Sequence, residues 1–339
     1  LMSGGGGSPT IHHCWTSLDV AGCTADQAAM TAAIQQWADD INFGSGGVAV
    51  SETLSSSSLT LADGVQDVGS ERVTDNLIAF WEFKEGTGLI AADTSGVVPA
   101  IDLSLQGTDI TWLTSYGVSI VEGRLFASGT TARKLYDRIA SQENGTNQYS
   151  VELWIHNARV DLTGPARIIS YSTNSNRRNM MLGQVQYQYF FRNRSTDPEI
   201  SLNGTEALET YGPDEDLQDR LQHVVMTYDQ YRGRRIYVDG VYTDDVDEFG
   251  GDPLWNWDPS YPLVFGDEAN FGRQWEGQVR MAAVYEAALT DAQIQQNYIA
   301  GVGKRLKMRF DVAQWAGVGT AVEFVVSDFD PGSYLFCTP

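Results

Sequence analysis

Short runs in which apolar and polar residues alternate fill the chain between residues 77 and 301. Alternation with a period of two predicts strands that bury one face. Asp239-Gly240 has the composition of a type I′ hairpin turn. Many short strands with turn residues between them, and no helices alternating with them, predict an antiparallel sandwich. The clearest runs are Leu77–Phe83, Tyr149–Ile155, His223–Tyr228 and Arg235–Val238.

Two capping boxes predict helices, because a Thr side chain and a Gln three positions later satisfy each other's free backbone N–H groups. Thr24 and Gln27 begin an amphipathic helix that follows a Gly-rich coil. Thr290 and Gln293 begin a second, short helix, and Gly301 ends it.

These patterns divide the chain into segments, and we expect the whole to be part of a longer protein. The segments are a Gly-rich coil with the amphipathic helix (1–43), a candidate remnant of an upstream domain; a Ser/Gly-rich linker (44–76); the sandwich (77–301); and a β extension or the start of a further β module (302–339).

The charge balance excludes some partners. The chain has 44 acidic and 22 basic side chains, a formal net charge of −22, which repels phosphate backbones and anionic lipid. No apolar run approaches the roughly 20 residues that span a bilayer. We therefore expect neither nucleic-acid binding nor direct membrane insertion. A Gly- and aromatic-rich composition with 19% charged residues favours a secreted β protein, extracellular or at the cell surface, with the periplasm as the alternative.

The three cysteines, Cys14, Cys23 and Cys337, are an odd number. In an oxidising compartment we predict a disulfide between Cys14 and Cys23. Cys337 is then left free, or paired with another chain or with sequence outside this one.

Five motifs lie in a recognisable order: Ile78–Gly88, Tyr149–Ile155, Leu221–Asp229, Ile236–Val241 and Ala288–Ile294. Together they resemble the laminin-G-like, concanavalin-A-like jelly-roll family of bacterial surface proteins. We therefore predict a mostly β protein: an antiparallel jelly-roll β-sandwich with a short N-terminal helical segment and a C-terminal β extension. Because this fold carries lectins, adhesion modules, hydrolases and spacers, it leaves the function open.

The resemblance also implies a calcium site, since family members often hold calcium near an Asp-x-Ser-Gly turn. Asp93 begins that turn here, and Asp102 or Asp267 could add carboxylate oxygens. Arg280 stands where relatives often carry an acidic residue, and its charge opposes a cation.

The N-terminal segment resembles the tail of a class I cytochrome c domain. Met2 is followed by a Gly-rich loop, and Ala32–Asp40 lies in the predicted helix. The resemblance makes Met2 the axial haem ligand. No Cys-x-x-Cys-His motif is present, so haem c requires an upstream domain. The alternative is an ordinary amphipathic helix after a Gly-rich loop.

Three aromatic residues, Trp255, Trp257 and Tyr261, lie in a loop rich in Pro and Asp. Aromatic faces beside carboxylates and amides are typical of sugar recognition, so this loop is the candidate carbohydrate site. The alternative is that the rings pack against the sandwich. Exposed rings would indicate a lectin, and buried rings a scaffold.

Paired carboxylates are the remaining candidate chemistry. Asp245 and Asp247 would share one face of a strand, as a glycan-active hydrolase needs, although a solvated acidic loop is the simpler interpretation. The leading prediction is a non-catalytic binding or adhesion protein whose partner is a carbohydrate or another surface protein. The alternative is a structural or interaction module of a larger surface assembly, and its forms include self-assembly and fusion to an upstream c-type cytochrome. A glycan-active hydrolase ranks third.

Overall fold

The computed structural model describes residues 72–302 apart from 114–116, 213–216 and 249–250, together with the backbone of three strands at 59–67, 306–312 and 320–326. The predictions that concern Met2, the Cys14–Cys23 pair, the helix beginning at Thr24 and Cys337 fall outside these residues. The chain forms two compact units, Leu1–Gly69 with Gly301–Pro339, and Ser70–Ala300.

The first unit contains a three-stranded antiparallel sheet in the order β1-β16-β17, with strands β1 (Leu59–Asp67), β16 (Leu306–Val312) and β17 (Thr320–Val326). β16 and β17 lie in the C-terminal segment for which a β extension or the start of a further β module is predicted. The expectation that 44–76 is a linker is wrong for residues 59–67. The partner strand of β1 is β16, which follows the sandwich in sequence. No local sequence pattern therefore predicts this pairing.

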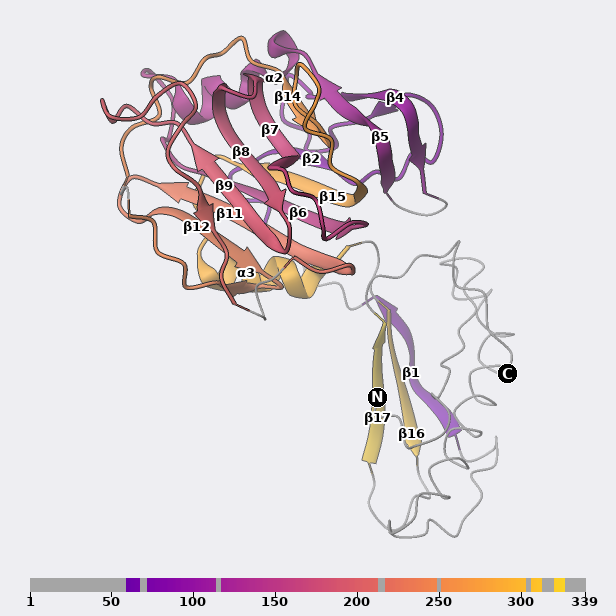
Figure 1. Cartoon of the computed structure of the whole chain (residues 1–339). Helices are drawn as coiled ribbons and strands as arrows, with labels where there is room; N and C mark the ends of the chain where they lie inside the picture. Colours follow the sequence, from indigo (N-terminus) through magenta and orange to yellow (C-terminus); the bar gives the residue numbers. More distant parts are fainter. Residues whose placement is uncertain are drawn as a thin grey trace. The chain divides into compact units, whose positions relative to one another are not determined.

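The second unit is a curled antiparallel sheet, as the strand pattern predicts (Figure 1). Its main path runs β10-β9-β8-β7-β14-β5-β15-β6-β11-β12-β13, with β2 beside β15, and β3 and β4 beyond β5. The strands are β2 (Leu77–Trp81), β3 (Ile90–Ala91), β4 (Leu103–Trp112), β5 (Val118–Ala127), β6 (Tyr149–Asn157), β7 (Ala166–Asn174), β8 (Arg177–Val185), β9 (Gln188–Asn193), β10 (Leu208–Glu209), β11 (Leu221–Asp229), β12 (Gly233–Val238), β13 (Val241–Tyr242), β14 (Leu263–Phe265) and β15 (Gly277–Tyr285).

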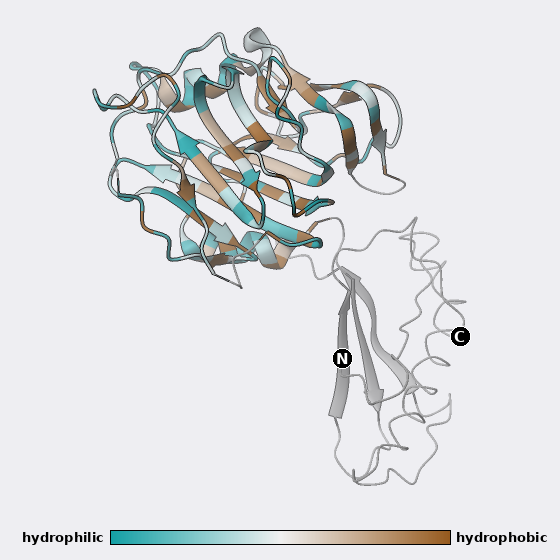
Figure 2. Cartoon of the chain, in the orientation of Figure 1, coloured by the Kyte–Doolittle hydropathy of each residue, from teal (hydrophilic) through white to brown (hydrophobic). Residues whose placement is uncertain are grey.

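The hydrophobic core fills the inside of this curled sheet, and Figure 2 shows apolar and polar positions interleaved along many of its strands. Trp81 is fully buried and meets Phe265 edge to face, with ring centroids 5.6 Å apart. Its indole N–H donates to the carbonyl of Ile101 at 2.8 Å. The ring therefore buries a large apolar area while its one polar atom is satisfied.

Both predicted local signals of the sandwich are confirmed. Asp239 and Gly240 have φ angles of 50° and 82°, the positive values that a type I′ turn requires at both central positions. Helix α3 (Asp291–Ala300) begins with the capping box, in which Gln293 N donates to Thr290 Oγ1 at 3.3 Å and Thr290 N donates to Gln293 Oε1 at 2.9 Å.

A second helical segment was not predicted. Helix α2 (Gly129–Leu135) continues directly into a π-helical turn, Tyr136–Ala140. Ser128 caps it, since its Oγ accepts a hydrogen bond from Thr131 N at 3.3 Å. In the part of the chain that the structure describes, no helix combines the length and apolar character needed to cross a membrane.

The two ends of the sheet path approach each other on one side of the sandwich. β9 and β12 pack together there without forming a ladder. Arg234 of β12 bridges them, because its Nη1 donates to the carbonyl of Phe191 in β9 at 2.8 Å. This open edge is where the candidate site lies.

Candidate functional site

The predicted aromatic loop does not form a three-ring binding surface. Trp257 and Tyr261 are only 3% and 6% exposed, so the prediction that they stack on a sugar is wrong. The Trp257 ring packs against Tyr149 and Tyr171 at centroid distances of 5.3 and 5.8 Å. Burying these rings removes a large apolar area from water, which explains why they join the core. Trp255 alone is open to solvent, at 44% exposed.

The predicted calcium ligand Asp93 is already fully engaged. Its Oδ2 lies 2.8 Å from Lys134 Nζ in a buried ion pair, and the same ammonium donates to the carbonyl of Val97 at 2.7 Å. Backbone N–H groups of Phe80, Ser95 and Ile101 also donate to this carboxylate. Burial alone would raise the pKa of Asp93, but Lys134 and these hydrogen bonds lower it below the ordinary value.

The other two predicted ligands do not complete a metal site. Asp102 accepts a hydrogen bond from the Asp93 backbone N–H at 3.0 Å. Asp267 instead organises its own turn, accepting from the N–H groups of Glu268 and Arg273 at 2.7 Å each. Among the described residues no three His, Cys, Asp or Glu side chains form a group that could hold a metal ion. These three carboxylates therefore do not fit calcium, which would have to displace the Lys134 ammonium from Asp93.

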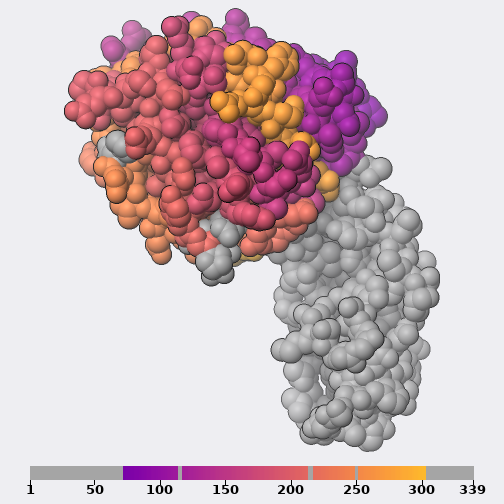
Figure 3. Space-filling model, viewed as in Figure 1, coloured from indigo at the N-terminus to yellow at the C-terminus, as the bar shows by residue number. Residues whose placement is uncertain are grey.

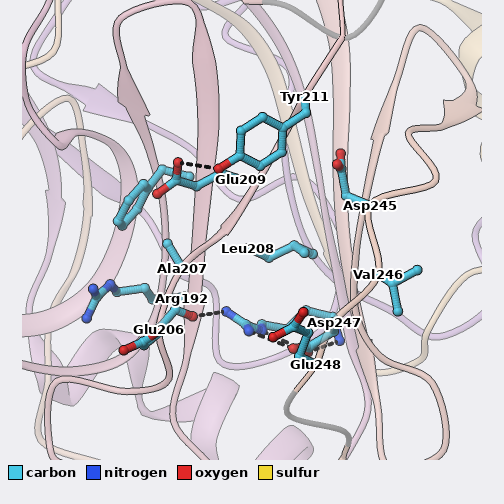
Figure 4. Close-up of a pocket in the computed structure, with 12 residues that line it drawn as sticks. Arg192, Glu206, Ala207, Leu208, Glu209, Tyr211, Asp245, Val246, Asp247 and Glu248 are labelled. Carbon is cyan, nitrogen blue, oxygen red and sulfur yellow. Dashed lines mark hydrogen bonds and ion pairs between the residues drawn. The ribbon is translucent and has the colours of Figure 1, made fainter.

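A cavity of about 540 Å³ opens at the edge of the sandwich where β9 and β12 meet (Figure 4). Residues from four separate stretches of the chain build it, so its walls combine both ends of the sheet path. The lining residues are Phe190, Arg192, Glu206, Ala207, Leu208, Glu209, Tyr211, Arg234, Asp245, Val246, Asp247 and Glu248. We call it the edge cavity.

A buried ion pair forms one wall of the edge cavity. Arg234 Nε and Nη2 donate to the two carboxylate oxygens of Asp247 at 2.8 and 2.7 Å, and both side chains are 1% exposed. The remaining Nη1 donates to the carbonyls of Phe191 and Glu206. A single guanidinium thus fixes the segment after β13 to β9 and to the segment before β10.

Tyr211 presents an aromatic ring at the rim of the edge cavity. It is 66% exposed, and its hydroxyl donates to Glu209 Oε2 at 3.4 Å (Figure 4). The charge of Glu209 raises the pKa of the Tyr211 hydroxyl, which stays a hydrogen-bond donor. Val246, 75% exposed, adds an apolar side chain to the same cavity.

Asp245 lies at the same end of the edge cavity as Tyr211 (Figure 4). Its Oδ2 is buried and has no hydrogen-bond partner in the structure. Burial raises the pKa of Asp245, although hydrogen bonds from Thr243 and the Tyr211 backbone act in the opposite direction. The carboxyl group can turn about its broad χ2 torsion, which would offer this oxygen to a ligand in the cavity.

The cavity carries an excess of hydrogen-bond acceptors. Arg234 neutralises Asp247, which leaves Arg192 as the remaining cation among four further carboxylates that line the cavity: Glu206, Glu209, Asp245 and Glu248. Such a lining accepts hydrogen bonds from hydroxyl groups and repels anions.

The predicted carboxylate pair of a hydrolase is only partly reproduced. Asp245 and Asp247 both line the edge cavity, but they follow β13 in an irregular segment rather than sharing a strand face. Both oxygens of Asp247 are held by Arg234. Asp247 is therefore not available as a nucleophile or as a base for water.

Sequence reasoning missed Tyr211, Glu209 and Arg192, because they come from segments with no distinctive motif. The sequence holds one signal, the order Leu208-Glu209-Thr210-Tyr211, because in an extended segment alternate residues share a face. The structure agrees with it: Leu208 and Thr210 are buried, and Glu209 and Tyr211 are on the outward face. The sequence does not show which residues lie opposite Glu209 and Tyr211 across the cavity.

Residues 130–295 match the family model described as Concanavalin A-like lectin/glucanases superfamily, a laminin-G-like model. The match covers just under half of the chain and lies within the Ser70–Ala300 unit. The match confirms the resemblance that the motif order predicts for this sandwich. No curated protein matches the sequence.

Solved structures of similar fold include the binding domain of botulinum neurotoxin serotype D, with 16% identity, a TM-score of 0.47, and 67% of this chain and 52% of that chain covered. The binding domain of Paraclostridial Mosquitocidal Protein 1 gives 14% identity and a TM-score of 0.49, over 66% of this chain and 52% of that one. The chain spans about half the length of these solved chains. These values show a similarity of fold alone.

Proposed function

We propose that this chain is a non-catalytic binding protein that recognises carbohydrate through the edge cavity. One observation supports this most: the exposed ring of Tyr211 stands beside carboxylates, and one of them, Asp245, has an oxygen without a hydrogen-bond partner. Sugars offer what such a site lacks, namely C–H groups that lie on an aromatic face and hydroxyl groups that donate to carboxylates.

The size of the cavity agrees with this ligand class. Small-molecule sites have volumes of about 300–1,000 Å³, and the edge cavity of about 540 Å³ falls inside that range. Its rigid wall, the Arg234–Asp247 pair, fixes the position of neighbouring carboxylates before a ligand arrives, which lowers the entropic cost of binding.

The family supports a binding role and leaves catalysis open, since its description includes both lectins and glucanases. The state of Asp247 favours binding, because a carboxylate that accepts two hydrogen bonds from a buried arginine is occupied. Composition and family together favour a protein that acts outside the cell and adheres to glycans on a surface.

A second candidate function is that of a module within a larger surface assembly. β1 precedes the sandwich in sequence and β16 follows it, yet the two strands pair. The sandwich is thus inserted into another folding unit that both ends of the chain build. An upstream c-type cytochrome with Met2 as haem ligand, and self-assembly of the chain, are forms of this alternative.

A glycan microarray tests the proposed function directly. We expect the wild-type chain to bind at least one glycan, and Tyr211→Ala to lose most of that signal. Trp255→Ala is the matched control, since Trp255 is an exposed ring that does not line the cavity. Equal signals from wild type and Tyr211→Ala would refute the edge cavity as the site.

A further inference from the structure

The edge cavity carries a net negative charge. Its lining contains two arginines against five carboxylates, which is a formal charge of −3. Arg234 and Asp247 cancel each other within their buried ion pair. None of the remaining carboxylates of the lining forms an ion pair with a described residue. These carboxylates are Glu206, Glu209, Asp245 and Glu248.

Among the residues that line the cavity, the cation outside that ion pair is Arg192. Figure 4 draws Arg192 and Glu206 at the end of the cavity away from the Tyr211 ring. Burial, and next the charge of Arg234, lower the pKa of Arg192, while the charges of Glu206 and Glu209 act in the opposite direction. The positive charge of the cavity therefore lies away from its exposed aromatic ring.

Two carboxylates lie next to Tyr211. Its hydroxyl donates to Glu209 Oε2 at 3.4 Å, and its backbone N–H donates to the carboxylate of Asp245. The charge of Glu209 raises the pKa of the Tyr211 hydroxyl, and burial and the charge of Asp245 add to this effect. Figure 4 shows the two carboxylates on different sides of the ring. An aromatic face beside two negative charges favours a cation.

Asp245 adds an unsatisfied acceptor to this end of the cavity. Its Oδ2 is buried and has no hydrogen-bond partner. Burial raises the pKa of Asp245 most, and the like charge of Asp244 adds to it. An ammonium group would supply both the missing hydrogen bond and the missing positive charge, and a hydrogen bond between charged groups is roughly twice as strong as one between neutral groups.

The Tyr211 end of the cavity is accessible from solvent. Tyr211 and Val246 are both exposed, so a ligand can reach the ring without moving the core. In Figure 3 the red surface of residues around 200 borders the orange surface of residues around 240 on one side of the molecule. Segments far apart in the sequence thus share a surface that an oligosaccharide can contact.

We propose that the edge cavity binds an amino sugar with a free, protonated amino group, whose ring lies on Tyr211 and whose ammonium lies between Glu209 and Asp245. The inference rests on the proposed function and names its ligand class. A hexosamine carries the ammonium directly on its ring, so the C–H face and the charge arrive together. A neighbouring hydroxyl also donates to Asp245, because a carboxylate accepts several hydrogen bonds. A lysine side chain instead carries its ammonium on a flexible stem, and ordering that stem costs conformational entropy.

The test compares oligosaccharides of glucose, N-acetylglucosamine and glucosamine that have the same length and linkage. They carry a hydroxyl, an acetamide and an ammonium group at the same carbon atom. In titration calorimetry with the full chain, we expect the glucosamine oligosaccharide to bind at least about tenfold more tightly than the other two, which is about 1.4 kcal/mol. Its affinity should fall as salt is raised from about 50 to 200 mM. Equal binding of all three, or no binding of the glucosamine oligosaccharide, would overturn the proposal.

Glu209→Gln and Asp245→Asn test the position of the ammonium. Each variant keeps the shape of the side chain and one acceptor oxygen but removes the charge, so each should weaken binding of the glucosamine oligosaccharide about tenfold. Glu143→Gln is the matched control, because Glu143 is exposed and does not line the cavity. Equal weakening by the control would reduce the effect to one of net charge and would overturn the proposal.

The glucose oligosaccharide checks that the variants keep the rest of the site. Because it carries no charge, Glu209→Gln and Asp245→Asn should change its binding less than that of the glucosamine oligosaccharide. Equal losses for both oligosaccharides would contradict recognition of the ammonium. A lysine tetrapeptide that binds as tightly as the glucosamine oligosaccharide would show that the cavity selects ammonium groups of any kind, and would overturn the assignment to an amino sugar.

The inference and the proposed function fail in different ways. If a neutral glycan binds at Tyr211 and the glucosamine oligosaccharide binds no more tightly than the glucose oligosaccharide, the inference fails and the proposed function stands. If no glycan of any kind binds, both fail.

Discussion

Arg234 and Asp247 form a bidentate ion pair at the open edge of the sandwich, with N···O distances of 2.8 and 2.7 Å. Both side chains are 1% exposed. Both residues belong to the β12–β13 end of the sheet path, and Arg234 Nη1 joins this end to the other by donating to the carbonyls of Phe191 and Glu206. The pair therefore holds the edge cavity in shape from its buried side.

Asp247→Asn should therefore destabilise the sandwich. Removing one partner of a buried pair leaves the other charge uncompensated, which costs about 3–5 kcal/mol. Urea unfolding followed by tryptophan fluorescence measures this loss. Asp244→Asn is the control, since Asp244 is an exposed residue of the same segment and should change the free energy of unfolding by less than about 0.5 kcal/mol. Equal effects would show that the pair contributes no more than a surface charge.

The role of the Tyr211 ring separates from that of its hydroxyl. Tyr211→Ala should weaken glycan binding about tenfold, about 1.4 kcal/mol, because the stacking face is lost. Tyr211→Phe keeps the ring and loses only the bond to Glu209, so it should weaken binding less than Tyr211→Ala. Titration calorimetry with a glycan chosen from the array distinguishes them; a larger loss for Tyr211→Phe would exclude stacking as the main contact.

Replacing Trp257 should affect stability as replacement of a core residue does, whereas replacing Trp255 should have the small effect of a surface substitution. Trp257→Ala removes a 3% exposed ring from the core and should cost about 3–5 kcal/mol. Trp255→Ala should cost less than about 0.5 kcal/mol, since its ring is 44% exposed. Chemical unfolding of both variants tests this, and similar values would contradict the packing described for the loop.

A buried carboxylate, Glu152, makes the stability of the sandwich depend on acid. It accepts hydrogen bonds from Tyr285 Oη at 3.1 Å and Asn297 Nδ2 at 2.7 Å, lies 3.0 Å from His223 Nε2, and pairs with Arg72. Burial alone would raise the pKa of Glu152, but Arg72 and His223 outweigh it and lower the pKa from 4.5 to about 2.

A lowered folded-state pKa means that Glu152 contributes stability above about pH 4.5, and that this contribution is lost as the pH falls toward 2. The expected loss is about 3 kcal/mol. Unfolding curves between these pH values should show a weaker pH dependence for Glu152→Gln than for wild type. Glu143→Gln, an exposed control, should keep the wild-type slope, and a wild-type slope in Glu152→Gln would refute the assignment.

The ammonium of Lys134 should stabilise the turn that begins at Asp93 by balancing the charge of the buried Asp93 carboxylate. The ammonium lies 2.8 Å from Asp93 Oδ2, with side-chain exposures of 2% and 0%. Lys134→Met should lower the free energy of unfolding by about 3 kcal/mol, the lower end expected for a broken buried pair, since three backbone N–H groups still hold the carboxylate. Millimolar calcium should leave the wild-type Tm unchanged. A clear rise in the Tm would show that the chain binds calcium, and would contradict the assignment of Lys134 as the partner of Asp93.

Features that depend on neighbours in sequence could be predicted. The Asp239-Gly240 turn and the Thr290–Gln293 capping box are each complete within four residues, and both form as expected. Helix α2 was missed because its first turn contains Gly129 and two threonines, which are poor helix formers. Its Ser128 cap is too common a residue to announce a helix.

Features that depend on distant partners could not be predicted. The rings of Trp257 and Trp255 are identical in sequence terms, and only the position of Tyr149 and Tyr171 makes one of them part of the core. The edge cavity combines segments around residues 190, 208, 234 and 246. No spacing rule joins them, because the curl of the whole sheet brings them together.

A crystal structure of the full chain with an array-selected glycan bound tests the central claim most directly. The account predicts a sugar ring lying on the face of Tyr211, with a hydroxyl group within hydrogen-bond distance of Asp245 Oδ2. A glycan bound elsewhere, for example against Trp255, with the edge cavity empty of it, would contradict the account.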